Sequence, residues 1–170
     1  MRNGRKANSV VDVLVEIPRG SRQKYELDAA TGRLRLDRVL FSSVHYPADY
    51  GFVMDTLGGD GDPLDALVVV EEPSFPGSVV PARPIGTLGM RDETRDDQKI
   101  LLVPEGDPRF AEVHDIKDLA PHWLREIENF FETYKELEDK APPKLSGWHG
   151  AAAARKLIAA ARKRASRERS

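Results

Sequence analysis

The sequence predicts an α+β fold in which a small closed or partly closed antiparallel β-barrel carries helices from the C-terminal part of the chain. Short apolar segments with strand-like alternation fill residues 11–103, whereas helical patterns fill residues 119–137 and 150–164. No repeat or linker divides the 170 residues, a length that suits one domain with its own core. We therefore expect a single domain over residues 1–170.

Strands dominate the first two thirds of the chain. Residues 11–17 alternate with a period of two and end at Pro18-Arg19-Gly20. Further strands are expected at residues 24–28, 33–40, 66–70, 78–88 and 99–103. Arg38 shares strand parity with Leu34 and Leu36, so an apolar face is expected to run into a guanidinium. Short strands in this number favour an OB-like barrel.

Two helices are expected to pack on this barrel. Apolar residues from Leu119 to Leu137 follow helical spacing and end before Pro142-Pro143, and an alanine-rich helix is expected from Gly150 to about Arg164. The domain is then divided into a loose N-terminal arm (1–9), a core that carries the chemistry (11–148), and a basic C-terminal helix and tail (150–170).

Composition excludes several classes of function. The chain has 26 basic and 28 acidic residues and no cysteine, so neither a global nucleic-acid signal nor a thiolate metal site is present. The N-terminus is basic like a signal peptide, but Asp12 and Glu16 interrupt the apolar run that should follow. No segment has the length of a membrane span. We expect a soluble, unexported protein.

The most informative segment is an acidic loop that leads into a strand. Asp60, Asp62 and Asp65 lie within six residues, directly after Gly58-Gly59. Carboxylates this close repel one another unless they are solvated, protonated or bound to a hard cation, which makes a Mg²⁺ site the first hypothesis and a solvated acidic turn the alternative. A phospho-aspartate nucleophile should follow a buried strand instead of two glycines, so covalent chemistry is not expected.

A second group of charged residues strengthens the metal hypothesis. Asp92-Glu93 and Asp96-Asp97 precede Lys99, and Asp97 and Lys99 share strand parity. Lys24 and Glu26 form a similar pair, about 6.5 Å apart along a strand. Alternating acids and bases on one face suit a site for metal and phosphate, although each pair alone is better explained by a solvated strand face, because exposed ion pairs are common and weak.

Several ordered motifs resemble those of the family I soluble inorganic pyrophosphatases. The resemblance covers residues 11–148 and rests on Glu16-Ile17-Pro18, Lys24-Tyr25-Glu26, Asp37-Arg38, Tyr46-Pro47-Ala48-Asp49-Tyr50-Gly51, Asp60-Gly61-Asp62-Pro63-Leu64-Asp65-Ala66, Asp92-Glu93, Asp97 with Lys99, and Phe130-Phe131-Glu132-Thr133-Tyr134-Lys135. The chain is most similar to bacterial members, and Phe75-Pro76-Gly77 and Gly106-Asp107-Pro108-Arg109 favour actinobacterial ones.

The resemblance implies a role for each of these residues. One Mg²⁺ would be bound by Asp60, Asp65 and Asp97, a second would share Asp65, and a third would be held by Asp92 and Asp97. Metal that arrives with the substrate would be supported by Glu16 and Glu26. Phosphate-binding positions are matched by Lys24, Arg38, Tyr50, Tyr134 and Lys135, and the same site would contain Tyr46 and Lys99. Tyr134 also lies on the apolar stripe of its helix, so a plain core residue is the alternative there.

These residues predict hydrolysis of pyrophosphate to two phosphates by metal-activated water, without a covalent phosphoenzyme. Asp62 is free to act as the base, and Asp97 is the alternative. The site has three more carboxylates than cations. The seven carboxylates are Glu16, Glu26, Asp60, Asp62, Asp65, Asp92 and Asp97, and the four cations are Lys24, Arg38, Lys99 and Lys135. With about four further negative charges from pyrophosphate, about three or four Mg²⁺ would balance the loaded site. Mn²⁺ is a possible substitute because it also accepts carboxylate oxygens.

The bacterial resemblance further implies a cytoplasmic enzyme that assembles as a homohexamer and acts in phosphate metabolism. The rival hypothesis is a non-catalytic barrel that binds nucleotides or RNA through its basic tail. A solvated helix end explains the tail better, because cations suit a helix C-terminus and aromatic stacking residues are absent. Nucleic-acid binding and membrane association are therefore not expected.

Overall fold

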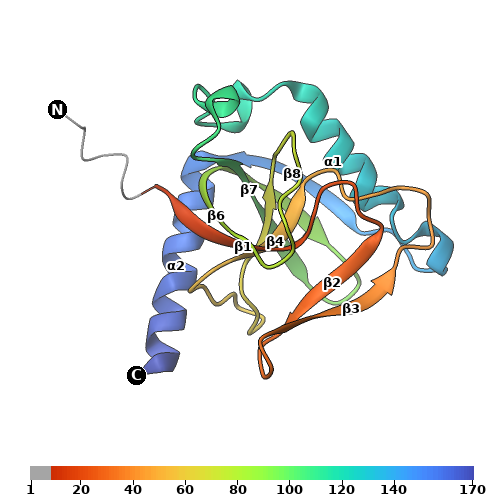
Figure 1. Ribbon diagram of the computed structural model, residues 1–170, viewed down its shortest axis with the longest axis horizontal. Helices are drawn as coiled ribbons and strands as arrows, with labels where there is room; N and C mark the ends of the chain where they lie inside the picture. Colours follow the sequence, from red (N-terminus) through yellow and green to blue (C-terminus); the bar gives the residue numbers. More distant parts are fainter. Residues whose placement is uncertain (1–8) are drawn as a thin grey trace.

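A closed ring of five strands forms the centre of the protein, seen in a computed structural model that describes residues 9–170 (Figure 1). The expected arm at residues 1–9 lies, except for Ser9, outside the described residues. In spatial order the ring contains β1 (Val11–Ile17), β4 (Asp49–Val53), β5 (Asp65–Val68), β7 (Asp96–Pro104) and β6 (Val79–Arg91). Pairing of β1 with β6 closes the ring, which confirms the closed arrangement predicted from the sequence.

Two further groups of strands lie outside the ring. β8 (Lys144–Gly150) pairs with the second half of β6, while β2 (Gln23–Asp28) and β3 (Arg33–Val39) form a separate hairpin. The hairpin projects from the ring beside β1, as Figure 1 shows. It carries three of the predicted site residues, so its attachment to the ring bears on the site.

The sheet is mixed, whereas an antiparallel sheet was expected. β5 and β7 run parallel, with Ala66 opposite Ile100, and the other pairings are antiparallel. The reason is topological. Directions alternate from β1 through β4 to β5, and from β1 through β6 to β7, because these pairings are antiparallel. β5 and β7 therefore both run in the direction of β1 and are parallel where they meet.

Two strands, β4 and β8, were not predicted from the sequence. β4 has five residues with Gly51 at its centre, and β8 contains Gly147 with a φ of 106°. Glycine weakens intrinsic strand preference, so these segments depend on pairing with neighbours that lie far away in the sequence.

Both predicted helices are present, with different ends. α1 spans Pro121–Thr133, and Leu137 lies beyond it on a short 3-10 helix, η3 (Glu136–Glu138), where its side chain is exposed. The expected stripe to Leu137 was therefore too long. α2 spans Ala151–Arg169 and extends beyond the predicted end at about Arg164, because alanine and arginine continue to favour a helix. No helix in residues 9–170 is long and apolar enough to cross a membrane.

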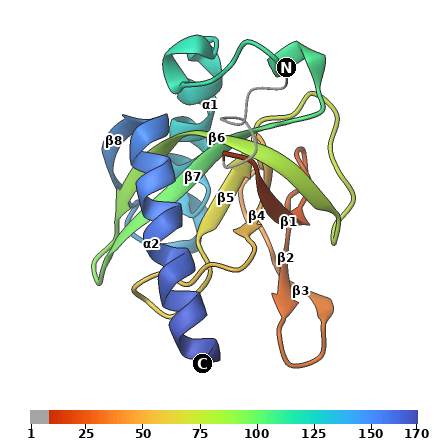
Figure 2. The same cartoon turned by 90° about the vertical axis from the view of Figure 1, so that its left-hand side faces the viewer.

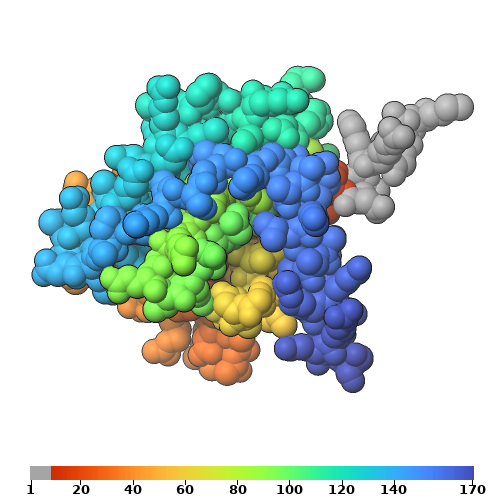
Figure 3. All heavy atoms as spheres, turned by 180° about the vertical axis from the view of Figure 1, so that it is seen from behind, coloured from red at the N-terminus to blue at the C-terminus, as the bar shows by residue number. Residues whose placement is uncertain are grey.

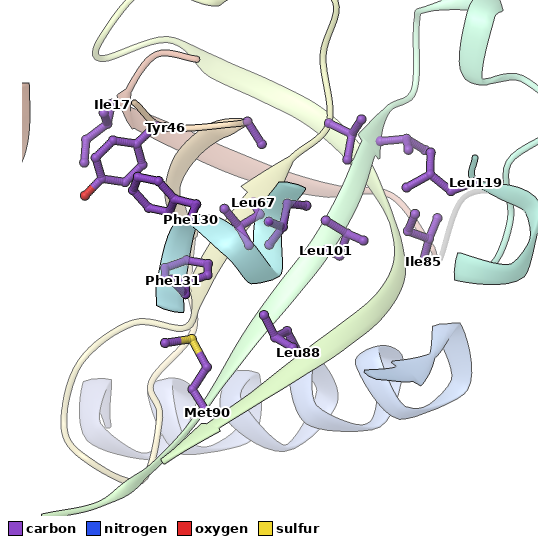
Figure 4. Packing of buried hydrophobic residues seen from close by; sticks show 14 of the residues in the cluster. Ile17, Tyr46, Leu67, Ile85, Leu88, Met90, Leu101, Leu119, Phe130 and Phe131 are labelled. Atoms are coloured by element: carbon purple, nitrogen blue, oxygen red, sulfur yellow. The ribbon is translucent and has the colours of Figure 1, made fainter. Parts of the chain in front are cut away.

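The two helices cover two different apolar clusters. α1 contributes Phe130 and Phe131 to a cluster that includes Leu67 and Leu101 (Figure 4), whereas α2 contributes Ala154 and Ile158 to a cluster that includes the next residues along β5 and β7. Figure 2 shows α2 lying across β6 and β7. Both faces of these strands are buried, which explains their unbroken apolar sequence.

β4 and β1 approach each other unusually closely at Gly51. A Cβ atom added to Gly51 would lie 1.8 Å from the carbonyl oxygen of Leu14, which is far inside van der Waals contact. The obstructing atom belongs to the backbone of a paired strand, so it cannot swing aside. Only glycine permits this pairing, and the next residue towards the N-terminus is Tyr50, a predicted site residue.

We predict that Gly51→Ala destabilises the protein by about 1–3 kcal/mol or more, because β1 and β4 must separate to admit a methyl group. Urea unfolding followed by circular dichroism measures the effect. Gly106→Ala is the matched control, since a Cβ there meets no atom within 4 Å. Equal stability of the two variants would contradict the close approach.

Candidate active site

A buried ammonium group lies at the centre of the predicted site. Lys99 is 8% exposed, and its Nζ donates hydrogen bonds to Asp65 Oδ2 and Asp97 Oδ2, both at 2.7 Å, and to the Tyr50 hydroxyl at 2.9 Å. Burial alone would lower the pKa of Lys99, but Tyr50 and the two carboxylates raise it well above its ordinary value. Lys99 is therefore a permanent cation that holds two acids from different strands together.

Aromatic rings form one wall beside Lys99. The ring of Tyr46 packs 5.5 Å from that of Tyr50 and 4.6 Å from that of Phe130, and Lys99 Nζ lies 5.7 Å from the ring centre of Phe131. Burial raises the pKa of Tyr46 and of Tyr50 well above the usual range, so both hydroxyls stay protonated. The wall keeps water away from one side of the ammonium and strengthens its electrostatic interactions.

Tyr134 and Lys135 extend this wall at the end of α1. Tyr134 packs against Phe130 and Phe131, with ring centres 5.1 and 5.7 Å apart, and Lys135 Nζ lies 5.1 Å from the Tyr134 ring. Tyr134 is half-buried, so it belongs to the apolar cluster and also borders the site. Both interpretations of Tyr134 from the sequence describe part of its surroundings.

The acidic loop is ordered by its own backbone. The amide of Gly58 donates to the carbonyl of Asp62 at 2.7 Å, and the amide of Asp62 donates to Asp60 Oδ1 at 3.0 Å. Asp60 also accepts from Arg95 Nη1 at 3.3 Å. Among the described residues, none donates a hydrogen bond to the Asp62 carboxylate, so this group is open to solvent or ligand.

Helix α2 supports the start of the same loop. The amide of Leu57 donates to the carbonyl of Ala161 at 3.0 Å, and Arg164 Nη1 donates to the carbonyl of Leu57 at 3.3 Å. Figure 3 shows the blue C-terminal helix against the yellow surface of this region. The basic helix thus has a structural role in anchoring the acidic loop, which the sequence did not reveal.

Glu16 faces the site from β1. Its Oε2 accepts a hydrogen bond from the amide of Leu27 at 2.7 Å, which ties the β2–β3 hairpin to the ring. Burial raises the pKa of Glu16 from 4.5 to about 7; the Leu27 amide opposes this shift, and the charges of Asp65 and Glu26 add to it. The charges of Glu26 and Asp65 therefore both act on Glu16.

The hairpin residues are arranged differently from the prediction. Lys24 pairs with Asp37 at 3.2 Å, and an extra residue in β3 places Lys24 opposite Arg38 and Tyr25 opposite Leu36. This bulge breaks the simple alternation, and Leu36 is exposed instead of lying on a buried apolar face. The expectation of an apolar face that runs into Arg38 was therefore wrong.

Arg38 has a partner that the sequence did not suggest. Its Nη1 donates to Oε1 of Glu138, whose side chain is only 8% exposed. Glu138 lies on η3, a hundred residues further along the chain, so strand parity could not have found it. Its position three residues after Lys135 was the only local signal.

The Asp92 carboxylate is bound by its own turn. It accepts hydrogen bonds from the amide and hydroxyl of Thr94 and from the amide of Arg95, and these contacts lower its pKa. The carboxylate is exposed, and its hydrogen bonds close its own turn in this structure.

The carboxylates fit a hard cation in their chemistry, although they are not pre-arranged around one. In residues 9–170, no group of three or more Asp, Glu or His side chains is placed to hold an ion. Burial is the main cause of the raised pKa of Glu16, and the nearby charges of Asp65 and Glu26 add to it; a bound cation would favour the ionised carboxylate. Carboxylate oxygens are the ligands that Mg²⁺ prefers.

Comparison with known proteins gives consistent matches. A family model described as inorganic pyrophosphatase matches residues 13–166. The inorganic pyrophosphatase of Leifsonia xyli is 51% identical over 149 residues, which cover 88% of this chain and 91% of that protein; that of Nostoc is 54% identical over 139 residues, 82% of each. The crystal structure of inorganic pyrophosphatase from Thermus thermophilus superposes with a TM-score of 0.90 at 43% identity, covering 98% of this chain and 97% of that one.

We predict that Glu16→Gln stabilises the metal-free protein at high pH but not at low pH. Native Glu16 has a raised pKa in the folded state, so the stability that its proton contributes is complete below pH 4.5 and is lost as the pH rises through about 7. The stability difference between variant and native protein should therefore grow from pH 5 to pH 8. Urea unfolding with a metal chelator, using exposed Glu112→Gln as the control, measures it. A difference that does not change with pH would contradict the raised pKa.

Proposed function

The chain belongs to the inorganic pyrophosphatase family, and from that membership we propose that it hydrolyses pyrophosphate to two phosphates. Water is the nucleophile, and no covalent phosphoenzyme forms. The observation that supports this proposal best is Lys99, whose buried ammonium holds the carboxylates of Asp65 and Asp97 together. An acidic site next to permanent cations suits a metal-loaded, highly anionic substrate.

Mg²⁺ is the proposed cofactor. Asp60, Asp65 and Asp97 would hold it, and Glu16, Glu26 and Asp92 would serve further ions. When bound, Mg²⁺ offsets the negative charge of the substrate and lowers the pKa of water. Charge balance suggests about three or four ions with substrate present, and Mn²⁺ is a possible substitute. Support comes from the carboxylate donor set and from Glu16, a largely buried carboxyl group that lies within the influence of Asp65 and Glu26.

The cations of the site would bind the two phosphoryl groups. Arg38 offers a planar guanidinium suited to paired hydrogen bonds with phosphate oxygens, while Lys24 and Lys135 act as point charges. The aromatic wall supplies hydroxyl groups from three tyrosines. Those of Tyr46 and Tyr50 stay protonated, and Tyr134 is a half-buried residue. Lys99 keeps its place between two carboxylates and restrains their positions.

Asp62 is the proposed general base. Asp97, the alternative, already accepts a hydrogen bond from the Lys99 ammonium at Oδ2, so this oxygen is engaged by the protein. No described residue occupies Asp62 in this way, so its carboxylate can accept a proton from water or orient the water molecule. Assembly as a homohexamer and a cytoplasmic location stay predictions that rest on the bacterial resemblance.

We predict that the protein releases phosphate from pyrophosphate only when Mg²⁺ is present. The requirement follows from a site whose carboxylates need cations before a polyanion can bind. A colorimetric phosphate assay with and without Mg²⁺ measures the release. Release that continues unchanged in a chelator would defeat the metal-dependent mechanism.

We predict that Asp65→Asn lowers turnover at saturating substrate by about two orders of magnitude or more, because Asp65 is both a proposed Mg²⁺ ligand and a partner of Lys99. Steady-state kinetics across a Mg²⁺ series measures the loss. Asp12→Asn on the exposed side of β1 is the matched control. Near-normal turnover of Asp65→Asn would remove this residue from the metal site.

A further inference from the structure

The pair formed by Arg38 and Glu138 joins β3 to η3, two elements that are far apart in the sequence. Arg38 lies on β3, in the hairpin outside the ring, and Glu138 lies on η3 after α1. The side chains are 22% and 8% exposed, so the ion pair is largely removed from water. Removal of either partner from such a pair leaves an uncompensated charge, which makes the pairing a strong restraint.

Each partner keeps one unused polar atom. Arg38 Nε and Glu138 Oε2 are buried and have no hydrogen-bond partner among the described residues. A side-on guanidinium–carboxylate contact would satisfy more atoms, yet the contact here is made through Nη1 alone. The carboxylate therefore fixes one corner of the guanidinium and leaves its other donors uncommitted to protein.

We propose that Glu138 is a positioning residue for Arg38, holding its guanidinium by one corner so that the remaining N–H groups are directed at a phosphoryl group of the substrate. A phosphate takes two parallel N–H donors from an arginine when the fork is correctly oriented. Free rotation of the long side chain would have to be restrained on binding, and Glu138 removes that cost in advance.

The placement of η3 supports this role. η3 begins directly after Lys135, its N-cap residue, and ends at Glu138; the following residue, Asp139, has a φ of 54°, which turns the chain sharply. The same short turn therefore delivers Lys135 and Glu138 to the site from one side, while the hairpin delivers Lys24 and Arg38 from the other. Together with the hydrogen bond between Glu16 and the Leu27 amide, the Arg38–Glu138 pair ties the hairpin to the remainder of the protein.

The inference rests on the proposed function, in which Arg38 binds phosphate. A rival role for Glu138 is competition, in which its carboxylate occupies the place of a phosphate oxygen and weakens substrate binding. The two roles predict opposite signs: loss of a positioning residue lowers kcat/KM for pyrophosphate, whereas loss of a competitor raises it.

A double-mutant cycle tests the proposal. We expect Glu138→Gln to lower kcat/KM for pyrophosphate by about tenfold, mainly through KM, because a charged hydrogen bond that orients Arg38 is lost. Arg38→Ala should lower it further. The double variant should match Arg38→Ala within about twofold, since Glu138 has nothing left to orient. Glu138→Asp, which keeps the charge, should recover part of the loss. The matched control is exposed Glu136→Gln on the same turn, which should behave as native.

Each remaining outcome decides against the proposal. A native or improved kcat/KM in Glu138→Gln would overturn it, and so would an equal loss in the presence and absence of Arg38. Thermal melts of all variants separate misfolding from mispositioning, because a purely structural role would lower the melting temperature without coupling to Arg38. If Arg38→Ala itself has native kinetics, phosphate binding by Arg38 fails and the inference fails with it; if only Glu138→Gln is native, the proposed function stands alone.

Discussion

The Lys99 ammonium, buried between the carboxylates of Asp65 and Asp97, is the interaction on which the other features of the site depend. An ammonium is costly to bury without anionic partners, and two carboxylates at this separation are costly to bring together without a cation. Each group is thus a condition for the other two. The parallel pairing of β5 and β7 supplies the geometry, since both acids lie at the same end of neighbouring strands.

Around this centre, three of the proposed metal ligands and most of the proposed phosphate-binding cations lie on different elements. The ring strands and their loops carry Asp60, Asp65 and Asp97, whereas the hairpin and η3 carry the arginine and lysine side chains proposed to bind phosphate. Only two polar contacts described above join the hairpin to the rest: Glu16 with the Leu27 amide, and Arg38 with Glu138. The substrate would be held between a rigid acidic surface and a cationic surface whose position these contacts set.

The sequence predicted the parts of this arrangement that depend on local pattern. Alternation found β1, the apolar segment at residues 99–103 indicated β7, and strand parity correctly placed Asp97 and Lys99 on one face. It could not find β4 or β8, which depend on distant partners, and a one-residue bulge in β3 invalidated the parity argument for Arg38. Glu138 was missed, like β4 and β8, because its contact is with a residue a hundred positions away in the sequence.

The parallel pairing of β5 with β7 also determines when the site can appear as the chain folds. The β2–β3 hairpin and the β6–β7 pair bring together residues that are near in sequence, whereas the pairing of β5 with β7 spans the whole of β6. Contacts between distant segments carry a larger loop-closure cost and form late. Until then Asp60, Asp62 and Asp65 are a self-repelling acidic segment without Lys99. Pyrophosphate-binding competence would therefore be among the last properties that the folding chain acquires.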